Sequence, residues 1–372
     1  MPDRHIYNRC VKKWDVILVG GGVIGLTLAL ELRRSGASVL VLDRNEPGRE
    51  ASFASGGMIA WCDPHLDSRL VELAKASAQL YPPLVKELEA EAGQSVGSRE
   101  QGAILFLRAN EKPRAGRELT GDAVRELEPK VIAAGHHAFF VPEASIDPRL
   151  LVAALLATIK NRGVDVASGS EVSQVIVEDH KARGVRTART EYRGETVINC
   201  AGAWAALIKA PSPAPTRPAK GHMLAVVGQE ALTHGSDPSA RDMLLTHVVR
   251  DPATVYLVPR SDGRIVIGST LEPAGFDKRV LPHTIQRLHQ QAANLLPDLG
   301  HARILESWTG LRPGTPDNLP IMGATSTPGY FVSTGHYRDG ILLAPVSAQI
   351  MTQIVHGITP AFDLSAFSPA RF

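Results

Sequence analysis

The chain has 372 residues, a length that favours two domains over one. Its 40 basic and 38 acidic residues leave a formal net charge of +2, and no basic block with interleaved aromatic residues occurs, which argues against nucleic acid as a partner. The apolar, uncharged run at residues 16–30 is shorter than the roughly 20 residues that cross a bilayer, so we expect no membrane span. Residues 1–13 are basic and lack an apolar stretch, and we interpret them as a frayed tail rather than a secretory signal.

Residues 15–44 read as a strand, a glycine turn, a helix and a second strand. Gly20, Gly22 and Gly25 give the Gly-X-Gly-X-X-Gly spacing, which permits a tight turn, close approach of a pyrophosphate and close packing of the helix on the strand. The helix N-terminus offers free N–H groups to phosphates. Asp43 follows the second strand, where a carboxylate can bind the ribose hydroxyls. This unit predicts a dinucleotide site, although it does not separate FAD from NAD.

The next segments predict a loop, helices and strands. The stretch 50–58 is rich in small residues, which suits a loop lying across a ring or pyrophosphate. The alternative is a plain surface loop. Apolar residues at helical spacing over 70–88 predict two helices that meet at a break at Pro82 and Pro83. We further predict strands at 102–107 and 138–141, and a capped helix at 122–127.

The middle of the chain alternates between helix and strand. Asp147 followed by Pro148 predicts an N-capped helix over 149–162. A strand beginning at 196 would deliver Ala201 and Gly202 to a tight turn, which suits a cofactor at the carboxyl ends of parallel strands. The four prolines within 210–218 predict a stiff crossover between domains. Further strands are predicted at 164–166 and 171–178, with a turn near 180–184.

The last third predicts an antiparallel block followed by a return to helix and strand. Residues 254–259 and 264–269 are predicted to form a hairpin through Ser261-Asp262-Gly263. The other predicted elements are a strand at 223–227, a helix at 281–296, a glycine- and proline-bearing loop at 308–317, a strand at 330–333 and a closing helix at 341–356.

The cysteines and histidines argue against disulfides and metal. Cys10, Cys62 and Cys200 are odd in number, lie far apart and form no Cys-X-X-Cys motif, which favours a reducing compartment, so we expect a cytoplasmic protein. No His-Glu-X-X-His motif occurs, and the adjacent pair His136 and His137 is poorly placed for joint ligation. We therefore predict no metal.

Four separated stretches resemble one family, the FAD-dependent D-amino-acid oxidase superfamily, and within it the glycine oxidase branch. They are residues 16–25, the strand pair from 255–260 to 268–270, the loop 308–317 with the sequence Trp-Thr-Gly-Leu-Arg-Pro-Gly-Thr-Pro-Asp, and residues 335–345, Gly-His-Tyr-Arg-Asp-Gly-Ile-Leu-Leu-Ala-Pro. The resemblance implies FAD rather than NAD. It also implies non-covalent binding, because the segment that precedes Thr315-Pro316-Asp317 lacks the cysteine that attaches flavin in sarcosine-oxidase-like relatives.

Pattern and resemblance together predict an α/β fold, α+β overall. A Rossmann-like FAD-binding domain is predicted at residues 14–80, 146–210 and 306–372, and a second, mostly antiparallel β domain for the substrate at 81–145 and 211–305. The residues expected to bind FAD are Gly20, Gly22, Val23, Ile24, Gly25, Asp43, Arg44, Ser52, Ser55, Gly57, Met58, Val172, Ala201, Gly202, Trp204, Gly310, Arg312, His336, Arg338, Gly340, Ile341 and Leu342.

An amino-acid oxidase must hold the substrate carboxylate, and the planar fork of arginine suits that task. By resemblance, Arg312 and Tyr256 clamp this carboxylate, and Arg338 lies at the entrance or also contacts it. The alternatives are surface salt bridges for the arginines and a packed core ring for Tyr256. His336 is the titratable group nearby, and we interpret it as supporting rather than catalytic. The partial positive charge at the start of the closing helix, near Ile341, is expected to stabilise reduced flavin, with simple capping as the alternative.

The resemblance implies oxidative deamination of glycine or another small amino acid. Hydride would pass from Cα to FAD, and O2 would be the acceptor, giving a 2-oxo acid, ammonia and H2O2; in glycine oxidase relatives the product can feed thiazole formation for thiamine. The alternatives are a D-amino-acid dehydrogenase that uses a quinone or another acceptor, and a non-catalytic flavoprotein. The expected partners are thus a small amino acid and O2, and we expect a homo-oligomer.

Overall fold

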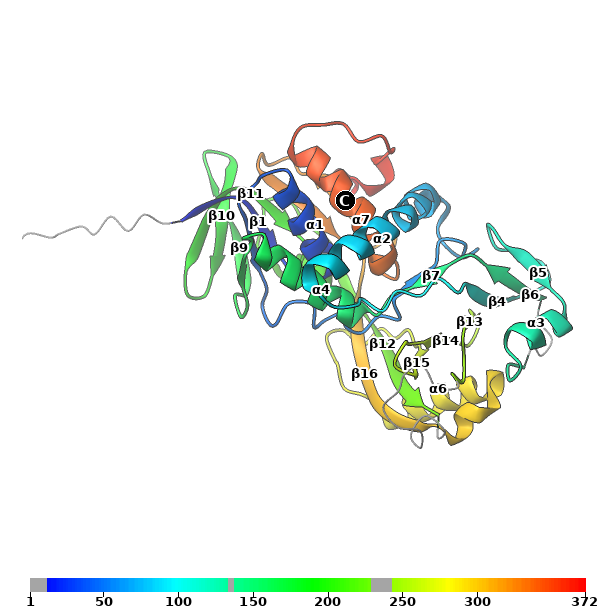
Figure 1. Ribbon diagram of the computed structural model, residues 1–372. Coiled ribbons are helices and arrows are strands. Elements are labelled where there is room, and N and C mark those ends of the chain that lie inside the picture. The colour runs from blue at the N-terminus through cyan, green and yellow to red at the C-terminus, as the bar shows by residue number, and fades with distance from the viewer. Residues whose placement is uncertain (1–11, 133–136, 229–242) are drawn as a thin grey trace, which may run out of the picture.

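The computed structural model describes residues 12–132, 137–228 and 243–372, in which two large sheets and one short sheet are present (Figure 1). Cys10, His136 and residues 1–11 of the predicted tail lie outside the described residues. One large sheet is mostly parallel and flanked by helices, and the other is mostly antiparallel. This arrangement confirms the predicted fold class.

The first sheet is organised around β1 (Lys13–Val19), which pairs in parallel with β2 on one side and β11 on the other. The strand order is β17-β18-β11-β1-β2-β8, and β10 joins β11 to β9. The strands beside β1 are β2 (Val39–Leu42), β8 (Asp165–Ala167), β9 (Val172–Glu178), β10 (Lys181–Thr187), β11 (Glu191–Asn199), β17 (Ile321–Ala324) and β18 (Tyr330–Thr334). All four residues from Val16 to Val19 are buried, as expected where both faces of a parallel sheet are covered.

Helices cover one face of this sheet, as Figure 1 shows. They are α1 (Val23–Arg34), α2 (Val71–Ala92), α4 (Pro148–Asn161) and α7 (Gly340–Val355). The helix α1 lies between α4 and α7 and packs against both. Its leucines at 26, 28, 30 and 32 are all fully buried, as expected of a helix that is apolar nearly all round.

The prediction of two helices that break at Pro82 and Pro83 is wrong, because α2 is one continuous helix. Both prolines lie on its exposed face, where water can bind the carbonyl groups that lose their N–H partners. The residues beside the prolines hold the helix in place: Tyr81 and Leu84 are buried, and the Tyr81 hydroxyl donates a hydrogen bond to the carbonyl oxygen of Ile341 on α7. Tertiary packing therefore outweighs the local break.

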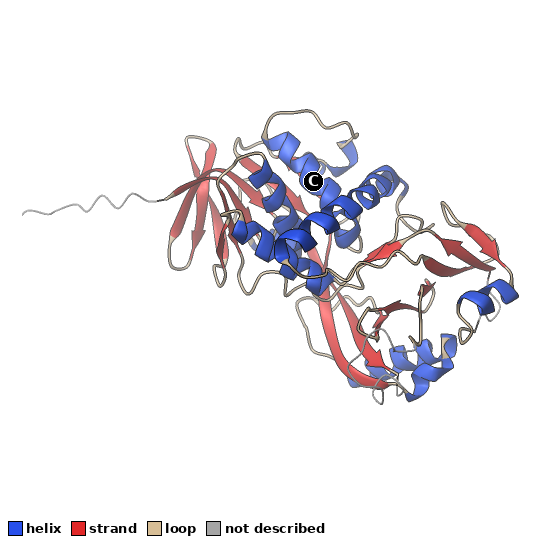
Figure 2. Cartoon of the chain, in the orientation of Figure 1, coloured by secondary structure: helices blue, strands red, loops and turns tan. Residues whose placement is uncertain are grey.

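The second sheet has the order β16-β12-β15-β14-β13-β4-β6-β5 and is antiparallel except between β13 and β4. Its strands are β4 (Ala103–Leu107), β5 (Arg117–Leu119), β6 (His137–Val141), β12 (Arg217–Val227), β13 (Val248–Asp251), β14 (Val255–Pro259), β15 (Arg264–Gly268) and β16 (Arg303–Gly314). The predicted hairpin is β14 and β15. One face packs on α3 (Gly121–Leu127) and α6 (Pro282–Leu295), which Figure 2 shows away from the helices of the first sheet.

The segment 308–317 was predicted as a loop, and this prediction is wrong for most of its length. Residues 303–314 form β16, which pairs with β12 from Val227 opposite Arg303 to Arg217 opposite Gly314. β16 is the edge strand of the sheet, where a proline such as Pro313 does not interrupt a ladder on its free side. The predicted turn near 180–184 is also shorter, because β10 begins directly after Asp179 and His180.

Two segments pack differently from their predicted domain. Residues 81–92 were placed in the substrate domain, but they are the second half of α2, which packs on α4 and α7 of the first sheet. Residues 306–314 were placed in the FAD-binding domain, but they belong to β16 of the second sheet. The short sheet of β3 (Met58–Ile59) and β7 (Ala144–Ser145) lies where the chain passes between the two large sheets. The division into a cofactor domain and a substrate domain remains a proposal.

The first testable prediction concerns Asp147, which caps α4 as expected. One carboxylate oxygen accepts the N–H groups of Arg149 at 2.9 Å and Leu150 at 3.5 Å, and the other lies 3.3 Å from Nη2 of Arg264. We expect Asp147→Ala to lower the free energy of unfolding by about 1–2 kcal/mol, measured by urea denaturation. Asp147→Asn keeps the cap and is the matched control. Equal losses in the two variants would mean that the ion pair, not the cap, is what Asp147 contributes.

Candidate functional site

A cavity of about 720 Å³ lies between the two large sheets. Its lining includes the carboxyl ends of β1 and β2, the loop 50–58, the first turn of α7 and the face of the second sheet that carries Arg312. The volume is in the range of small-molecule and cofactor sites. Every residue predicted to bind cofactor or substrate lines this cavity except Gly25.

Gly25 does not line the cavity, but it allows α1 to pack closely against the end of β1. A Cβ on Gly25 would lie 2.0 Å from the carbonyl oxygen of Gly20, so only glycine lets α1 approach β1 this closely. Gly20 has φ +110°, and a Cβ there would lie 2.4 Å from the carbonyl oxygen of Cys200. The first helical N–H of α1, on Val23, donates to the hydroxyl of Ser52 at 2.9 Å. The glycines therefore bring α1, β1 and the end of β11 into direct backbone contact.

Asp43 lies at the end of β2 with its carboxylate at the cavity wall. Its two oxygens accept the N–H groups of Gly21 at 2.8 Å and Asn45 at 2.9 Å, which fixes the side chain beside the glycine turn. Burial raises the pKa of Asp43. Nearby, the Arg44 guanidinium stacks 4.6 Å from the centre of a Trp204 ring, so these two predicted residues form one side of the cavity mouth.

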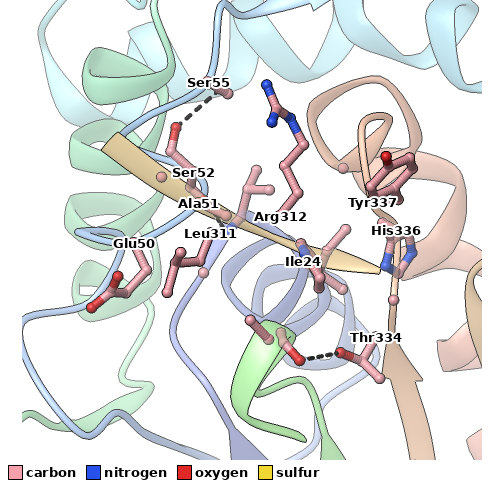
Figure 3. A pocket seen from close by; sticks show the side chains of 18 of the residues that line it. Ile24, Glu50, Ala51, Ser52, Ser55, Leu311, Arg312, Thr334, His336 and Tyr337 are labelled. Carbon is pink, nitrogen blue, oxygen red and sulfur yellow. Dashed lines mark hydrogen bonds between the residues drawn. The ribbon is translucent and has the colours of Figure 1, made fainter. Parts of the chain in front are cut away.

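The loop 50–58 lines the cavity, and its predicted position across a ring or pyrophosphate remains a proposal. The Ser55 hydroxyl donates to the carbonyl oxygen of Ser52 at 3.0 Å, the contact drawn in Figure 3. The second sheet holds the same loop: Nε1 of Trp308 donates to the carbonyl oxygen of Ala54 at 3.2 Å, and Nη2 of Arg260 donates to that of Gly56 at 2.9 Å. The loop thus connects the two sheets along the cavity.

Glycines of the second sheet lie directly against the side chains of Tyr256 and Arg312. Gly268 lies opposite Tyr256 on β14, and Gly221 lies opposite Gly310 on β16. A Cβ on Gly268 would lie 2.5 Å from the Tyr256 hydroxyl, and a Cβ on Gly221 would lie 2.4 Å from Nη1 of Arg312. Tyr256 and Arg312 both line the cavity, and the Tyr256 hydroxyl donates to the sulfur of Met223 at 3.6 Å.

Arg312 points into the cavity from β16, as Figure 3 shows. Its Nη1 donates to the carbonyl oxygen of Thr270 at 3.0 Å, and its Nη2 donates to the hydroxyl of Ser269 at 2.7 Å. Within the described residues, no carboxylate lies at ion-pair distance from Arg312. Burial lowers the pKa of Arg312, and the charge of Arg338 acts in the same direction. The cavity therefore contains a guanidinium whose charge is balanced by no neighbouring acid.

The first turn of α7 closes the far end of the cavity. Gly340, Ile341 and Leu342 line it, and no side chain caps the helix N-terminus, so its partial positive charge faces the cavity. His336 lies beside this turn, with Nε2 2.9 Å from the Ser347 hydroxyl. Burial lowers the pKa of His336 to about 3, so its ring is neutral at pH 7. A neutral, hydrogen-bonded ring agrees with a supporting role for His336.

Sequence reasoning missed several lining residues. Asp339 lies directly before α7, and burial raises its pKa to about 6. Gly221 and Met223 come from the part of β12 that lines the cavity, Ser269 also lines it, and Thr270, outside the lining, accepts a hydrogen bond from Arg312. The signal for Ser269 and Thr270 was present in the Gly-Ser-Thr motif of the resemblance, whereas the register that brings β12 to this site is not visible in the sequence.

The residues present fit FAD. Two helix N-termini, those of α1 and α7, end at the cavity without a side chain capping them from within their own turn, and glycine backbone forms both walls. The buried hydroxyl of Ser333, at the end of β18, lines the cavity and has no hydrogen-bond partner within the described part of the chain. Cys200 also lines it, and burial raises the pKa of its thiol to about 12, which keeps it neutral and agrees with non-covalent binding.

The described residues contain neither a candidate metal site nor a candidate membrane-spanning helix. No group of three or more His, Cys, Asp or Glu side chains is placed to hold a metal ion in residues 12–132, 137–228 and 243–372. Over the same ranges no helix combines the length and the apolar character needed to cross a membrane.

Comparison with known proteins adds a family to this geometry. Residues 15–354 match the family described as DAO, FAD dependent oxidoreductase. A glycine oxidase from Pseudomonas putida is 31% identical over 373 residues, which cover 95% of this chain and 98% of that protein. A glycine oxidase from Geobacillus kaustophilus is 32% identical over 380 residues, covering 96% of this chain and 97% of that protein.

Solved structures agree. The crystal structure of glycine oxidase from Geobacillus kaustophilus superposes with a TM-score of 0.88 at 30% identity, covering 97% of this chain and 99% of that one. The crystal structure of iminodiacetate oxidase from a Chelativorans species superposes with a TM-score of 0.83 at 25% identity, covering 95% of this chain and 98% of that one. The similarity thus extends over both sheets and the cavity between them.

Asp43 generates the prediction for the cofactor part of the site. We expect Asp43→Ala to lower the amount of FAD that purifies with the protein, because the variant loses both a ribose acceptor and the hydrogen bonds that order the glycine turn. Flavin absorbance per protein, measured after acid precipitation has released the flavin, tests this. Asp43→Asn keeps an acceptor and is the control, expected to retain more FAD than Asp43→Ala. Full flavin content in Asp43→Ala would remove Asp43 from the ribose site.

Proposed function

The chain belongs to the FAD dependent oxidoreductase family and is an FAD-dependent enzyme of the glycine oxidase type, and on this basis we propose that it oxidatively deaminates glycine or another small amino acid. The overall reaction would convert the amino acid, O2 and water into a 2-oxo acid, ammonia and H2O2. Bound FAD would supply the acceptor for the hydride that leaves Cα, and O2 would then remove the two electrons.

The observation that carries the proposal is the guanidinium of Arg312 in the cavity, without an acid partner in the described residues. A buried cation of this kind favours an anionic ligand, and the two N–H bonds to Thr270 and Ser269 leave further donors of the planar fork for a carboxylate. Tyr256 lies on the same face of the sheet, and we propose that its hydroxyl donates to the same carboxylate.

The remaining residues would orient the amino acid and enclose the space around it. The glycines of the second sheet allow close packing, Gly221 against the Arg312 guanidinium and Gly310 against Ala54 of the loop 50–58, and this loop lines the cavity from the side of the first sheet. The neutral ring of His336 is hydrogen-bonded to Ser347 and adds no charge, so the positive potential at this end comes from the N-terminus of α7 and from Arg338. The protein would hold the amino acid in a reactive geometry without a dedicated base.

Anaerobic mixing of the purified protein with single amines tests the reaction. We expect glycine or sarcosine to bleach the flavin faster than D-alanine or D-proline, and admission of air to restore the colour with formation of H2O2. Iminodiacetate belongs in the set because a structural neighbour is named for its oxidation. Bleaching without reoxidation by air would favour the dehydrogenase alternative, and no bleaching with any amine would favour a non-catalytic flavoprotein.

The oligomeric state and the cellular location are separate proposals. We propose a homo-oligomer, which light scattering after size exclusion tests, and a reducing, cytoplasmic location. Cys62 and Cys200 are both free and buried, and this is consistent with the absence of disulfides expected there.

Arg312 generates the prediction for the substrate part of the site. We expect Arg312→Met to raise KM for glycine at least about 30-fold with normal FAD content, because the loss of a charge-assisted contact to a carboxylate is worth about 2 kcal/mol or more. Arg312→Lys keeps the charge without the planar fork, so its KM for glycine should lie between those of the wild type and Arg312→Met. Steady-state kinetics, with flavin content measured on the same samples, tests this prediction. An unchanged KM would mean that Arg312 does not bind the substrate carboxylate.

A further inference from the structure

The guanidinium of Arg312 is held by a short segment that lies beyond the end of β15. Both of its acceptors, the Thr270 carbonyl oxygen and the Ser269 hydroxyl, follow Gly268, the last residue of the strand. The backbone of Thr270 itself makes one long N–H bond to β12, of 3.4 Å to the carbonyl oxygen of His222, and the next backbone bonds to β12 are those of Glu272. The direction of the guanidinium therefore depends on what fixes Thr270.

Side chains of His222 and Glu272 fix Thr270. The Thr270 hydroxyl accepts the backbone N–H of His222 at 2.9 Å and donates to Oε1 of Glu272 at 2.7 Å. Nδ1 of His222 lies 2.9 Å from the same Oε1, and its Nε2 accepts the N–H of Leu281 at 3.1 Å. Because Nε2 is an acceptor, the neutral ring carries its proton on Nδ1 and donates it to Glu272. The hydroxyl and both ring nitrogens thus have partners.

The backbone strengthens this arrangement. Lys220 and Glu272 exchange N–H···O bonds of 3.0 and 2.9 Å, and Nζ of Lys220 donates to the carbonyl oxygen of Arg279 at 2.6 Å. The side chain of His222 is completely buried, and burial lowers its pKa, which keeps the ring in the neutral form. Two alternate residues of β12 therefore hold the segment 269–281 at several points.

We propose that His222, Thr270 and Glu272 form a positioning network that fixes the carboxylate-binding face of Arg312 and thereby sets the affinity for the substrate carboxylate. The proposal rests on the proposed role of Arg312. None of the three residues lines the cavity, so they act through Arg312 and not on the substrate. A buried network whose members are all hydrogen-bonded is rigid, and a small error in the aim of a binding group weakens binding sharply.

Thr270 provides the sharpest test. Thr270→Val removes both hydroxyl bonds at nearly constant volume, whereas Thr270→Ser keeps them. We expect Thr270→Val to raise KM for glycine about tenfold and to weaken binding of acetate, followed by the flavin spectrum, by a similar factor. The kcat at saturating glycine, the flavin content and the melting temperature should stay close to wild type. Thr270→Ser should restore KM and acetate binding.

Glu272 provides a second variant pair in case Thr270→Val does not fold. Glu272→Gln retains an oxygen that accepts from His222 and Thr270 and should behave as wild type, whereas Glu272→Leu should reproduce the rise in KM. Glu118→Leu is the matched control, because it removes a pair between Nδ1 of His137 and Oε1 of Glu118 with the same 2.9 Å distance, on β5 and β6 of the same sheet. This control should leave KM unchanged.

The outcomes separate the two levels of the argument. If Arg312→Met weakens acetate binding and raises KM while Thr270→Val changes neither, the positioning network is wrong and the proposed function stands. If Arg312→Met itself leaves acetate binding and KM unchanged, Arg312 does not bind the carboxylate, and the proposed function loses the observation on which it rests. Parallel losses of kcat, flavin content and melting temperature in Thr270→Val and Glu272→Leu, without a selective rise in KM, would show a merely structural role and overturn the inference.

Discussion

The site depends on one constraint: glycines on both sheets must allow neighbouring groups to pack directly against the backbone beside the cavity. On the first sheet, Gly20 and Gly25 bring α1 and β1 into contact so close that a single Cβ would overlap a carbonyl oxygen. On the second sheet, Gly221 and Gly268 leave room for the side chains of Arg312 and Tyr256 to lie flat along the strands. Because a dinucleotide needs close backbone approach and its substrate needs a planar clamp, the same residue type meets both demands in different ways.

The charge pattern distinguishes Arg312 from two other buried arginines, Arg250 and Arg260. Arg250 and Arg260 are buried more completely than Arg312, and each has an acid nearby: Arg250 lies 2.9 Å from Asp63, and Arg260 lies 3.9 Å from Asp147. An unpaired buried charge is costly, so proteins pair the arginines that serve only the fold. Arg312 departs from this rule by taking only a carbonyl and a hydroxyl, and the anion that completes it is therefore expected to come from outside the chain.

The sequence predicted the parts of this site that are local. The glycine turn, Asp43 after β2 and the capped start of α4 depend on neighbours within one unit, and the structure has them where the spacing indicated. The errors at α2 and β16 have a common cause, since prolines there are tolerated by an exposed helix face and a sheet edge that exist only after folding. The network of His222, Thr270 and Glu272 was not predictable, because strand register alone brings β12 beside the segment after β15.

The topology explains why a cavity with these two functions forms at β1. The chain leaves β1 through α1 toward β2 on one side, whereas β11 lies on the other side, so the connections diverge at the carboxyl ends of these strands and leave a crevice. The strands from β12 to β16 are inserted in the sequence between β11 and β17, so they leave and re-enter the first sheet on the same side of β1. The second sheet therefore lies on the other side of the cavity that this crevice opens into. Its edge strand β16 thereby brings Arg312 to the same cavity as the glycine turn, which is the arrangement that the proposed function requires.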